Sequence, residues 1–265
     1  MSEIITKLSN RVNIKLSRAL NFASYKMSEL SLDIFYAFIS ELKYEDSELK
    51  LFKIRIVDLE EKIGRKIDRN YLQNIQSEFT TTVVALHKSS EKLTICNRFD
   101  FNSKEGWIEF EFNTEIKPHI LSVEKNFVSA DIRYLFMIKG AYSKRLYLLM
   151  KQNKDMSHKL EISLEDLRNI LSIDSNKYQL YADFKRRVIA SSQNQFNITD
   201  LNFKVKEIKT GRRVTDLIFR IQSFSTKLQS NTKTFKNSLN SLQNWLQESE
   251  KKEEIIEAEI IKQAS

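Results

Sequence analysis

Hydrophobic and polar positions follow the same order twice along the chain, about 108 residues apart. Ile54 and Ile56 alternate as in a short strand, and Leu59 and Ile63 then follow at helical spacing. The segment 162–171 has the same pattern of apolar positions. This internal repeat predicts two copies of one supersecondary unit rather than a single larger fold.

A longer amphipathic helix and a two-stranded hairpin are predicted after each of these segments. The helices are expected over residues 68–87 and 178–196. The hairpins are expected over residues 93–112 and 201–221, where apolar residues alternate on both strands and a glycine lies at each turn. The second half of each unit is therefore a helix followed by a hairpin.

A further helix is expected before each unit, over residues 31–42 and 141–151. The order helix, strand, helix, helix, hairpin is the outline of a winged helix-turn-helix domain. The sequence therefore predicts an α+β fold with two tandem winged helix-turn-helix domains. We expect the first domain over residues 1–124, the second over 125–224, and a helical or partly disordered tail over 225–265.

The net charge of +8 is concentrated in one part of the chain. Residues 1–125 contain 19 basic and 19 acidic side chains, and residues 225–265 contain six of each. Residues 126–224 contain 18 basic and 10 acidic side chains, which accounts for the whole excess. An ordinary solvated surface would spread this charge more evenly, so its confinement to one domain-sized block favours a nucleic-acid-binding face there.

Candidate DNA contacts in the second domain lie on the helix 180–196 and on the hairpin after it. Phe184, Val188, Ser192 and Phe196 are predicted to face the core. The opposite helix face and the hairpin carry basic and amide side chains, which suit phosphates and base edges. These candidates are Arg186, Arg187, Gln193, Asn194, Lys204, Lys206, Lys209, Arg212 and Arg213, and Ala190 on the same helix face is a small residue that permits close approach. A solvated helix face is the alternative, and the basic hairpin beside the helix argues against it.

The first domain has weaker candidates. Arg65, Lys66 and Arg69 lie near the start of its long helix, whereas its hairpin turn, Lys104-Glu105, is not basic. We expect a supporting or dimerising domain with limited phosphate contact.

Several chemistries are excluded by the residues available. His87, His119 and His158 lie at least 32 positions apart, so the metal-binding pair of a nicking enzyme is missing. The four glycines cannot form a phosphate-binding P-loop. Cys96 has no histidine at catalytic-motif spacing and is expected to be a buried small hydrophobe. We therefore expect no catalytic residues, no metal and no cofactor.

The chain is also expected to be a cytoplasmic protein without a membrane span. No apolar run approaches the length of about 18 residues that a membrane helix requires. A single cysteine excludes a disulfide framework and fits a reducing compartment.

Four segments are similar to a known family, the iteron-binding plasmid replication initiators (Rep proteins) with two winged-helix domains. These segments are SKRLYLLMKQ (143–152), ISLEDLRNIL (162–171), YADFKRRVI (181–189) and FKVKEIKTGRRVTDLIFRI (203–221). The resemblance covers roughly residues 10–224 and is good over 140–224. Arg145 and Tyr147 in the first segment are expected to be packing and helix-end residues.

The resemblance implies a set of functions and partners. Such initiators bind direct repeats in double-stranded DNA at a plasmid origin, and the second domain is the main reader. They exist as homodimers that repress their own promoter, in equilibrium with monomers that open the origin. They then recruit the host initiator ATPase and the replicative helicase. The matching positions are Lys185, Arg186 and Arg187 on the helix and Lys209, Arg212 and Arg213 on the wing. The run 193–197 departs from the family pattern, so the resemblance does not predict the base sequence of the DNA repeat.

Two alternatives from other classes remain at this stage. A winged-helix transcriptional regulator would carry one DNA-binding domain and an effector or dimerisation domain, whereas the internal repeat favours the initiator. A nicking enzyme is disfavoured by the histidine spacing. In the tail, Leu239, Leu242, Trp245 and Leu246 predict a short amphipathic helix. We expect it to pack on the domains, with docking of a helicase-loading partner or self-association as the alternative.

Overall fold

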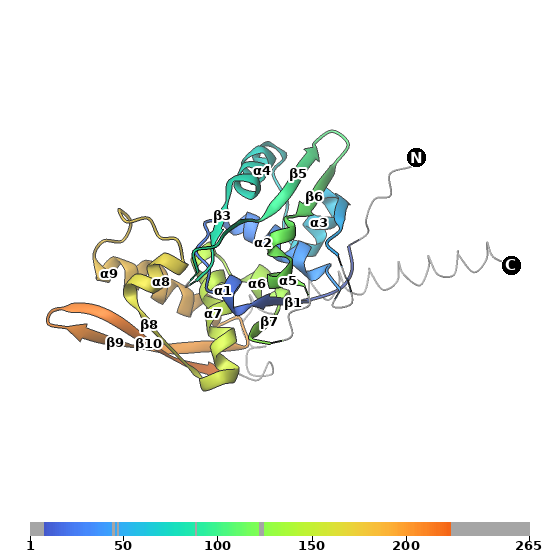
Figure 1. Ribbon diagram of the computed structural model, residues 1–265. Coiled ribbons are helices and arrows are strands. Elements are labelled where there is room, and N and C mark those ends of the chain that lie inside the picture. Colours follow the sequence, from blue (N-terminus) through green and yellow to red (C-terminus); the bar gives the residue numbers. More distant parts are fainter. Residues whose placement is uncertain (1–7, 44–45, 47, 88, 122–124, 224–265) are drawn as a thin grey trace.

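The chain folds into two repeats that share one order of helices and strands, apart from an extra hairpin in the first (Figure 1). The computed structural model describes residues 8–43, 46, 48–87, 89–121 and 125–223. The predicted helix in the tail lies outside the described residues. In Figure 1 the first repeat is coloured blue to green, and the second runs from green through yellow to orange.

The first repeat begins with a short strand and helix and ends in a hairpin. Its elements are β1 (Asn13–Ser17), α1 (Arg18–Asn21), α2 (Glu29–Ser40), β2 (Leu51–Arg55), α3 (Ile56–Ile63), a 3-10 turn (Arg69–Tyr71), α4 (Leu72–Thr81), β3 (Val83–Ala85), β4 (Lys92–Thr94), β5 (Cys96–Asn102) and β6 (Trp107–Phe112). A 3-10 turn (Thr114–Ile116) and α5 (Lys117–Ile120) lead to the second repeat. Strands β2, β6 and β5 form one antiparallel sheet in that order, and β3 pairs with β4.

The second repeat follows the same plan with a longer hairpin. Its elements are β7 (Phe127–Asp131), α6 (Ile132–Met137), α7 (Ala141–Ser157), β8 (Lys159–Ser163), α8 (Leu164–Ile170), α9 (Tyr181–Phe184), a π-helical turn (Lys185–Ala190), α10 (Ser191–Phe196), β9 (Leu201–Thr210) and β10 (Arg213–Ser223). Strands β8, β10 and β9 form an antiparallel sheet in that order, with the β9–β10 hairpin as the wing.

Short polar residues start three of the helices that directly follow a strand, whereas α3 begins after Arg55 without a side-chain cap. The side chains of Ser17, Asp131 and Ser163 accept hydrogen bonds from backbone N–H groups in the first turns of α1, α6 and α8. Such caps satisfy donors that a helix leaves without an intrahelical partner. They allow strand and helix to adjoin without an intervening loop.

The leading strands of the two repeats pair with each other. β1 and β7 are antiparallel and are centred on the pair Lys15 and Ser129. Ile14 and Leu16 are buried on one strand, and Val128 and Ala130 on the other. This two-stranded sheet was not predicted, because each strand is only five residues long and pairs with a partner more than 100 residues away. The second repeat therefore starts with a strand, β7.

The first long helix is shorter than predicted. α4 ends at Thr81 rather than near His87, and Val83–Ala85 instead pairs with Lys92–Thr94. The run Thr80 to Val84 consists entirely of β-branched residues, which favour strands over helices. Leu93 therefore belongs to this extra hairpin, and the wing of the first repeat starts at Cys96.

Insertions at different places in the two repeats explain the nearly constant repeat spacing. The segments β2–α3 and β8–α8 start 108 residues apart. The first repeat has the extra β3–β4 hairpin before its wing, whereas the second has a longer loop before its long helix, residues 171–180 compared with 64–68. The second repeat gains five residues in this loop and three in its long helix, and the first gains about ten with its extra hairpin. The wings therefore start 105 residues apart, close to the spacing of 108.

Buried polar contacts join the two repeats across a continuous apolar core. Arg145 of α7 donates to the carbonyl oxygens of Ala23 and Tyr25, and its guanidinium lies 3.7 Å from the centre of the Tyr25 ring. Lys144 pairs with Asp33 of α2 at 2.6 Å, and both side chains are at most 1% exposed. The structure thus places Arg145 in packing, as the sequence indicated.

Candidate DNA interface

The long helix of the second repeat runs unbroken from Tyr181 to Phe196 through a π-helical turn. Phe184, Val188, Ser192 and Phe196 are fully buried, which confirms the predicted inner face. They recur every four residues, so a regular α-helix would rotate this row by about 40° at each step. The wider π-turn counteracts this drift. Such turns are rare and occur often at functional sites.

A basic run lies on the exposed side of this helix, just where the π-turn begins. Lys185, Arg186 and Arg187 are all exposed. The Lys185 ammonium lies 2.8 Å from Glu207 on the wing, and this contact lowers the pKa of the Glu207 carboxyl. Arg186 pairs with Asp183 one turn earlier at 2.7 Å. The ion pairs are solvent-exposed and therefore weak, so the cations can exchange them for phosphates.

The two amides predicted on this face differ in their surroundings. Asn194 is exposed. Gln193 is half-buried, and its Nε2 donates to the carbonyl oxygen of Phe203 on β9 at 2.9 Å. Asn202 Nδ2 donates in turn to the Gln193 carbonyl oxygen. Gln193 therefore joins the helix to the wing, and we remove it from the expected base contacts.

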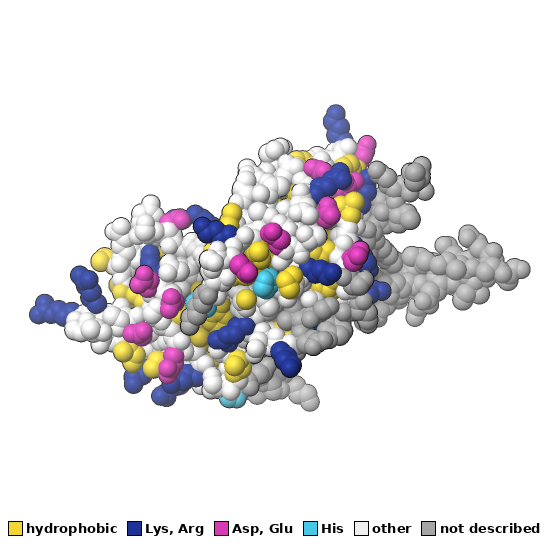
Figure 2. Space-filling model, viewed as in Figure 1, with side chains coloured by type: hydrophobic (Ala, Val, Ile, Leu, Met, Phe, Trp, Pro, Cys, Tyr) yellow, Lys and Arg dark blue, Asp and Glu magenta, His cyan; other side chains and the backbone are white. Residues whose placement is uncertain are grey.

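The wing presents basic side chains along one hairpin. Its two-residue turn is Gly211-Arg212, and positive φ at Gly211 is typical of a type II′ turn. All five basic candidates on the hairpin are exposed: Lys204, Lys206, Lys209, Arg212 and Arg213. Lys and Arg side chains project at the left end of the molecule in Figure 2, where Figure 1 places the wing tip.

A cleft of about 770 Å³ separates the wing tip from the start of the long helix. One side carries Lys209, Arg212 and Arg213, and the other carries Leu180 and Tyr181. Sequence reasoning missed this cleft, because nothing in the pattern shows that the loop 171–180 lies across from the wing tip. The signal available in the sequence was Leu180, an apolar residue that lies outside the buried face of the helix.

The three basic candidates of the first repeat are engaged in ion pairs. Arg65 lies 2.8 Å from Glu29 and 3.4 Å from Asp33, so it binds α2 and is removed from the expected DNA contacts. Lys66 is 88% exposed and Arg69 half-buried, and both pair with Glu60.

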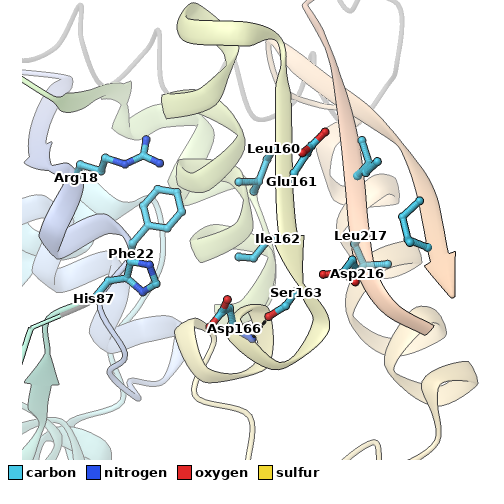
Figure 3. A pocket seen from close by; sticks show the side chains of 12 residues that line it. Arg18, Phe22, His87, Leu160, Glu161, Ile162, Ser163, Asp166, Asp216 and Leu217 are labelled. Atoms are coloured by element: carbon cyan, nitrogen blue, oxygen red, sulfur yellow. Dashed lines mark hydrogen bonds between the residues drawn. The ribbon is translucent and has the colours of Figure 1, made fainter. Parts of the chain in front are cut away.

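A second cavity, of about 530 Å³, lies where the repeats meet (Figure 3). Phe22 and His87 of the first repeat face Leu160 and Ile162 on the edge strand β8. Glu161, Asp166 and Asp216 also line this cavity. Three carboxylates beside an apolar wall do not suit a phosphate backbone, so this cavity is not part of the candidate interface.

The described part of the chain has neither a candidate metal site nor a membrane-spanning helix. It contains no group of three or more His, Cys, Asp or Glu side chains that could hold a metal ion. None of its helices is both long and apolar enough to cross a membrane. Cys96 is buried in β5, and burial raises the pKa of its thiol to about 12. A thiol of this kind is unsuited to nucleophilic chemistry.

Two family models match this chain in the order of its repeats. Residues 13–151 match the first winged-helix domain of the initiator replication proteins, described as "Initiator Replication protein, WH1". Residues 163–221 match their second, described as "Initiator Rep protein, WH2". The chain belongs to the initiator replication protein family. The first match alone spans more than half of this initiator, and the predicted α+β fold of two tandem winged-helix domains is confirmed.

One solved structure shares the fold of this initiator. The Pi initiator protein in complex with iteron DNA is matched over 82% of this chain and 99% of the Pi chain, with 19% identity and a TM-score of 0.62. Domains 2–3 of RctB are matched more distantly, over 76% of this chain and 83% of that chain, with 12% identity and a TM-score of 0.40. No curated protein sequence matches this chain significantly.

Proposed function

We propose that this protein initiates plasmid replication by binding directly repeated iterons with its second repeat. The observation that supports this most strongly is the unbroken run Lys185 to Arg187 on the long helix, facing outward beside a basic wing. A helix of this kind fits the major groove, and a wing reaches the adjacent backbone. The Pi initiator, which has the same fold, was crystallised with iteron DNA.

The two repeats have different roles in this proposal. The second reads the sequence, because its exposed cations pair at most with single carboxylates at the surface. The first supports it and contacts phosphates through Lys66 and Arg69. We assign no catalytic residue, and the protein acts by binding alone. Opening of the origin, recruitment of the host ATPase and helicase, and repression of its own promoter by a dimer belong to the same proposal.

Selection of binding sites from random duplex DNA tests the proposal. The full-length protein is used at about 0.15 M salt, where screening suppresses loose electrostatic binding. The expected result is one asymmetric motif of roughly two helical turns per monomer, since each repeat contributes one contact region. An inverted repeat would instead favour a dimeric regulator or the autorepressing dimer, and no enrichment would overturn the proposal.

A matched pair of variants shows which repeat reads the motif. Replacing Lys185, Arg186 and Arg187 by Ala is expected to abolish enrichment. Replacing Lys66 and Arg69 by Ala is expected to weaken binding while the motif stays the same. The reverse result would assign sequence reading to the first repeat.

A further inference from the structure

Leu180 is exposed in a way that packing does not explain. It is 70% exposed, more than any other large hydrophobic side chain in the described part of the chain. It immediately precedes α9 and lines the cleft between the long helix and the wing tip. Residues at the start of a recognition helix are those that reach base edges.

The loop that ends at Leu180 is held firmly in place. Arg168 donates to three of its backbone carbonyl oxygens, those of Asp174, Lys177 and Tyr178, at 2.7–3.3 Å. The Tyr178 ring packs edge-on against Tyr142, with 6.4 Å between the ring centres. A side chain at the end of such a braced loop has a defined position, as base recognition requires.

The first repeat also anchors this loop. Ser24 and Ser172 share a hydrogen bond at 3.0 Å between their hydroxyl groups. Lys26 pairs with Asp174 at 2.9 Å. The loop 171–180 is twice as long as its counterpart in the first repeat and is bound to both halves of the molecule. The structure therefore fixes an exposed leucine beside the basic residues of the wing.

We infer that Leu180 contacts the 5-methyl group of a thymine and thereby specifies a T·A pair in the DNA repeat. Lys209, Arg212 and Arg213 on the opposite side of the cleft hold the phosphate backbone of the strand that enters it. The thymine methyl is the one apolar group that a base presents in the major groove, and aliphatic side chains recognise it. This inference rests on the proposed function and adds a specificity residue to it.

Replacing thymine by uracil tests the contact, because the two bases differ only by the methyl group. Each thymine of the selected motif is changed to uracil in turn, and affinity is measured for the wild type, Leu180→Ala and Val57→Ala. Val57 is 42% exposed and lies on α3 in the first repeat, so it serves as the matched control. Both changes are at exposed positions, and thermal unfolding checks that each variant is folded.

At one thymine, uracil is expected to weaken wild-type binding about fourfold, the effect of one methyl group removed from water. Val57→Ala is expected to show the same loss, whereas Leu180→Ala binds both duplexes equally. The assignment of Leu180 is wrong if uracil has the same effect on Leu180→Ala as on the wild type at every position, or has no effect at any position. Binding of the DNA repeat by the protein would be unaffected by that result. Failure to select any repeat would refute the proposed function, and this inference with it.

Discussion

Gln76 and Gln193 make the same hydrogen bond in the two repeats. Gln76 Nε2 donates to the carbonyl oxygen of Phe99 at 2.6 Å, and Gln193 Nε2 donates to that of Phe203 at 2.9 Å. In each case an amide on the long helix binds the first strand of the wing. The angle between helix and wing is thus fixed in the same way twice.

The aromatic packing beside these glutamines confirms that the positions are equivalent. Phe79 lies three residues after Gln76, and its ring centre is 5.0 Å from that of Phe99. Phe196 lies three residues after Gln193, and its ring centre is 5.5 Å from that of Phe203. The structure therefore aligns these residues even though their separations along the chain differ from 108.

Replacing Gln193 by Ala is expected to lower stability rather than change base preference. The carbonyl oxygen of Phe203 would lose a partner, which costs about 1–2 kcal/mol. Gln76→Ala is the matched change in the first repeat and should cost a similar amount in urea unfolding. A changed binding motif for Gln193→Ala, without loss of stability, would restore this residue to base recognition.

Replacing Arg186 and Arg187 together by Ala is expected to remove specific binding while leaving the fold intact. Both side chains are exposed, so their loss creates no cavity. Loss of a good base contact costs about 1–3 kcal/mol at the contacted pair. Affinities for the selected repeat and for a scrambled duplex should become equal, whereas Lys104→Ala in the first wing turn should retain the difference. Retained specificity would exclude this part of the helix from reading.

Replacing Arg212 or Arg213 by Ala is expected to weaken binding to all sequences alike. Side chains at a wing tip contact phosphates, and each lost contact reduces the slope of log affinity against log salt by about one unit. The measurement is a salt titration on the repeat and on random duplex. An unchanged slope with altered base preference would instead place these arginines at base edges.

Replacing the buried pair Asp33 and Lys144 by Leu and Met is expected to leave stability unchanged or raise it by about 1–4 kcal/mol. Burial raises the pKa of Asp33 from 3.8 to about 6 and lowers the pKa of Lys144, so removal from water costs the pair more than its attraction returns. Urea unfolding of the double variant at pH 7 measures this. A large loss of stability would mean that the ion pair itself holds α2 against α7.

The same pair predicts a pH dependence. Because the folded-state pKa of Asp33 lies above its ordinary value, its contribution to stability is complete below about pH 4 and is lost as the pH rises towards 6. The wild type should therefore lose stability over this window relative to the double variant. Lys144→Met alone should extend the loss above pH 6, since it removes the closest positive charge. Parallel pH profiles for all three proteins would contradict the assignment.

Cys96 is expected to be unreactive in the folded protein. With a thiol pKa of about 12, only about one molecule in 10⁴ carries the thiolate at pH 8. A disulfide exchange reagent should therefore modify Cys96 only after unfolding in urea. Rapid modification of the native protein would show that β5 opens readily.

Local patterns were enough to predict the repeat and the faces of its helices. The row Phe184, Val188, Ser192 and Phe196 is buried as its periodicity indicated, and the basic wing lies beside the helix. These features depend on residues near each other in the chain, where apolar spacing and turn glycines act directly. The order of elements that defines the winged helix follows from the same signals.

Only the tertiary structure decided which polar side chains are available to bind. In the sequence, Gln193 and Arg65 cannot be told apart from exposed residues of the same kind, Asn194 and Arg187. In the fold, Gln193 donates to a carbonyl oxygen of the wing, and Arg65 pairs with carboxylates on α2. The pairing of β1 with β7 likewise joins residues more than 100 positions apart in the chain. The loop before Leu180 is an irregular segment that is held in place by contacts with distant residues. A one-dimensional pattern contains periodicity but not these partners, because a long side chain on a partly exposed face is directed by whichever neighbour the fold brings to it.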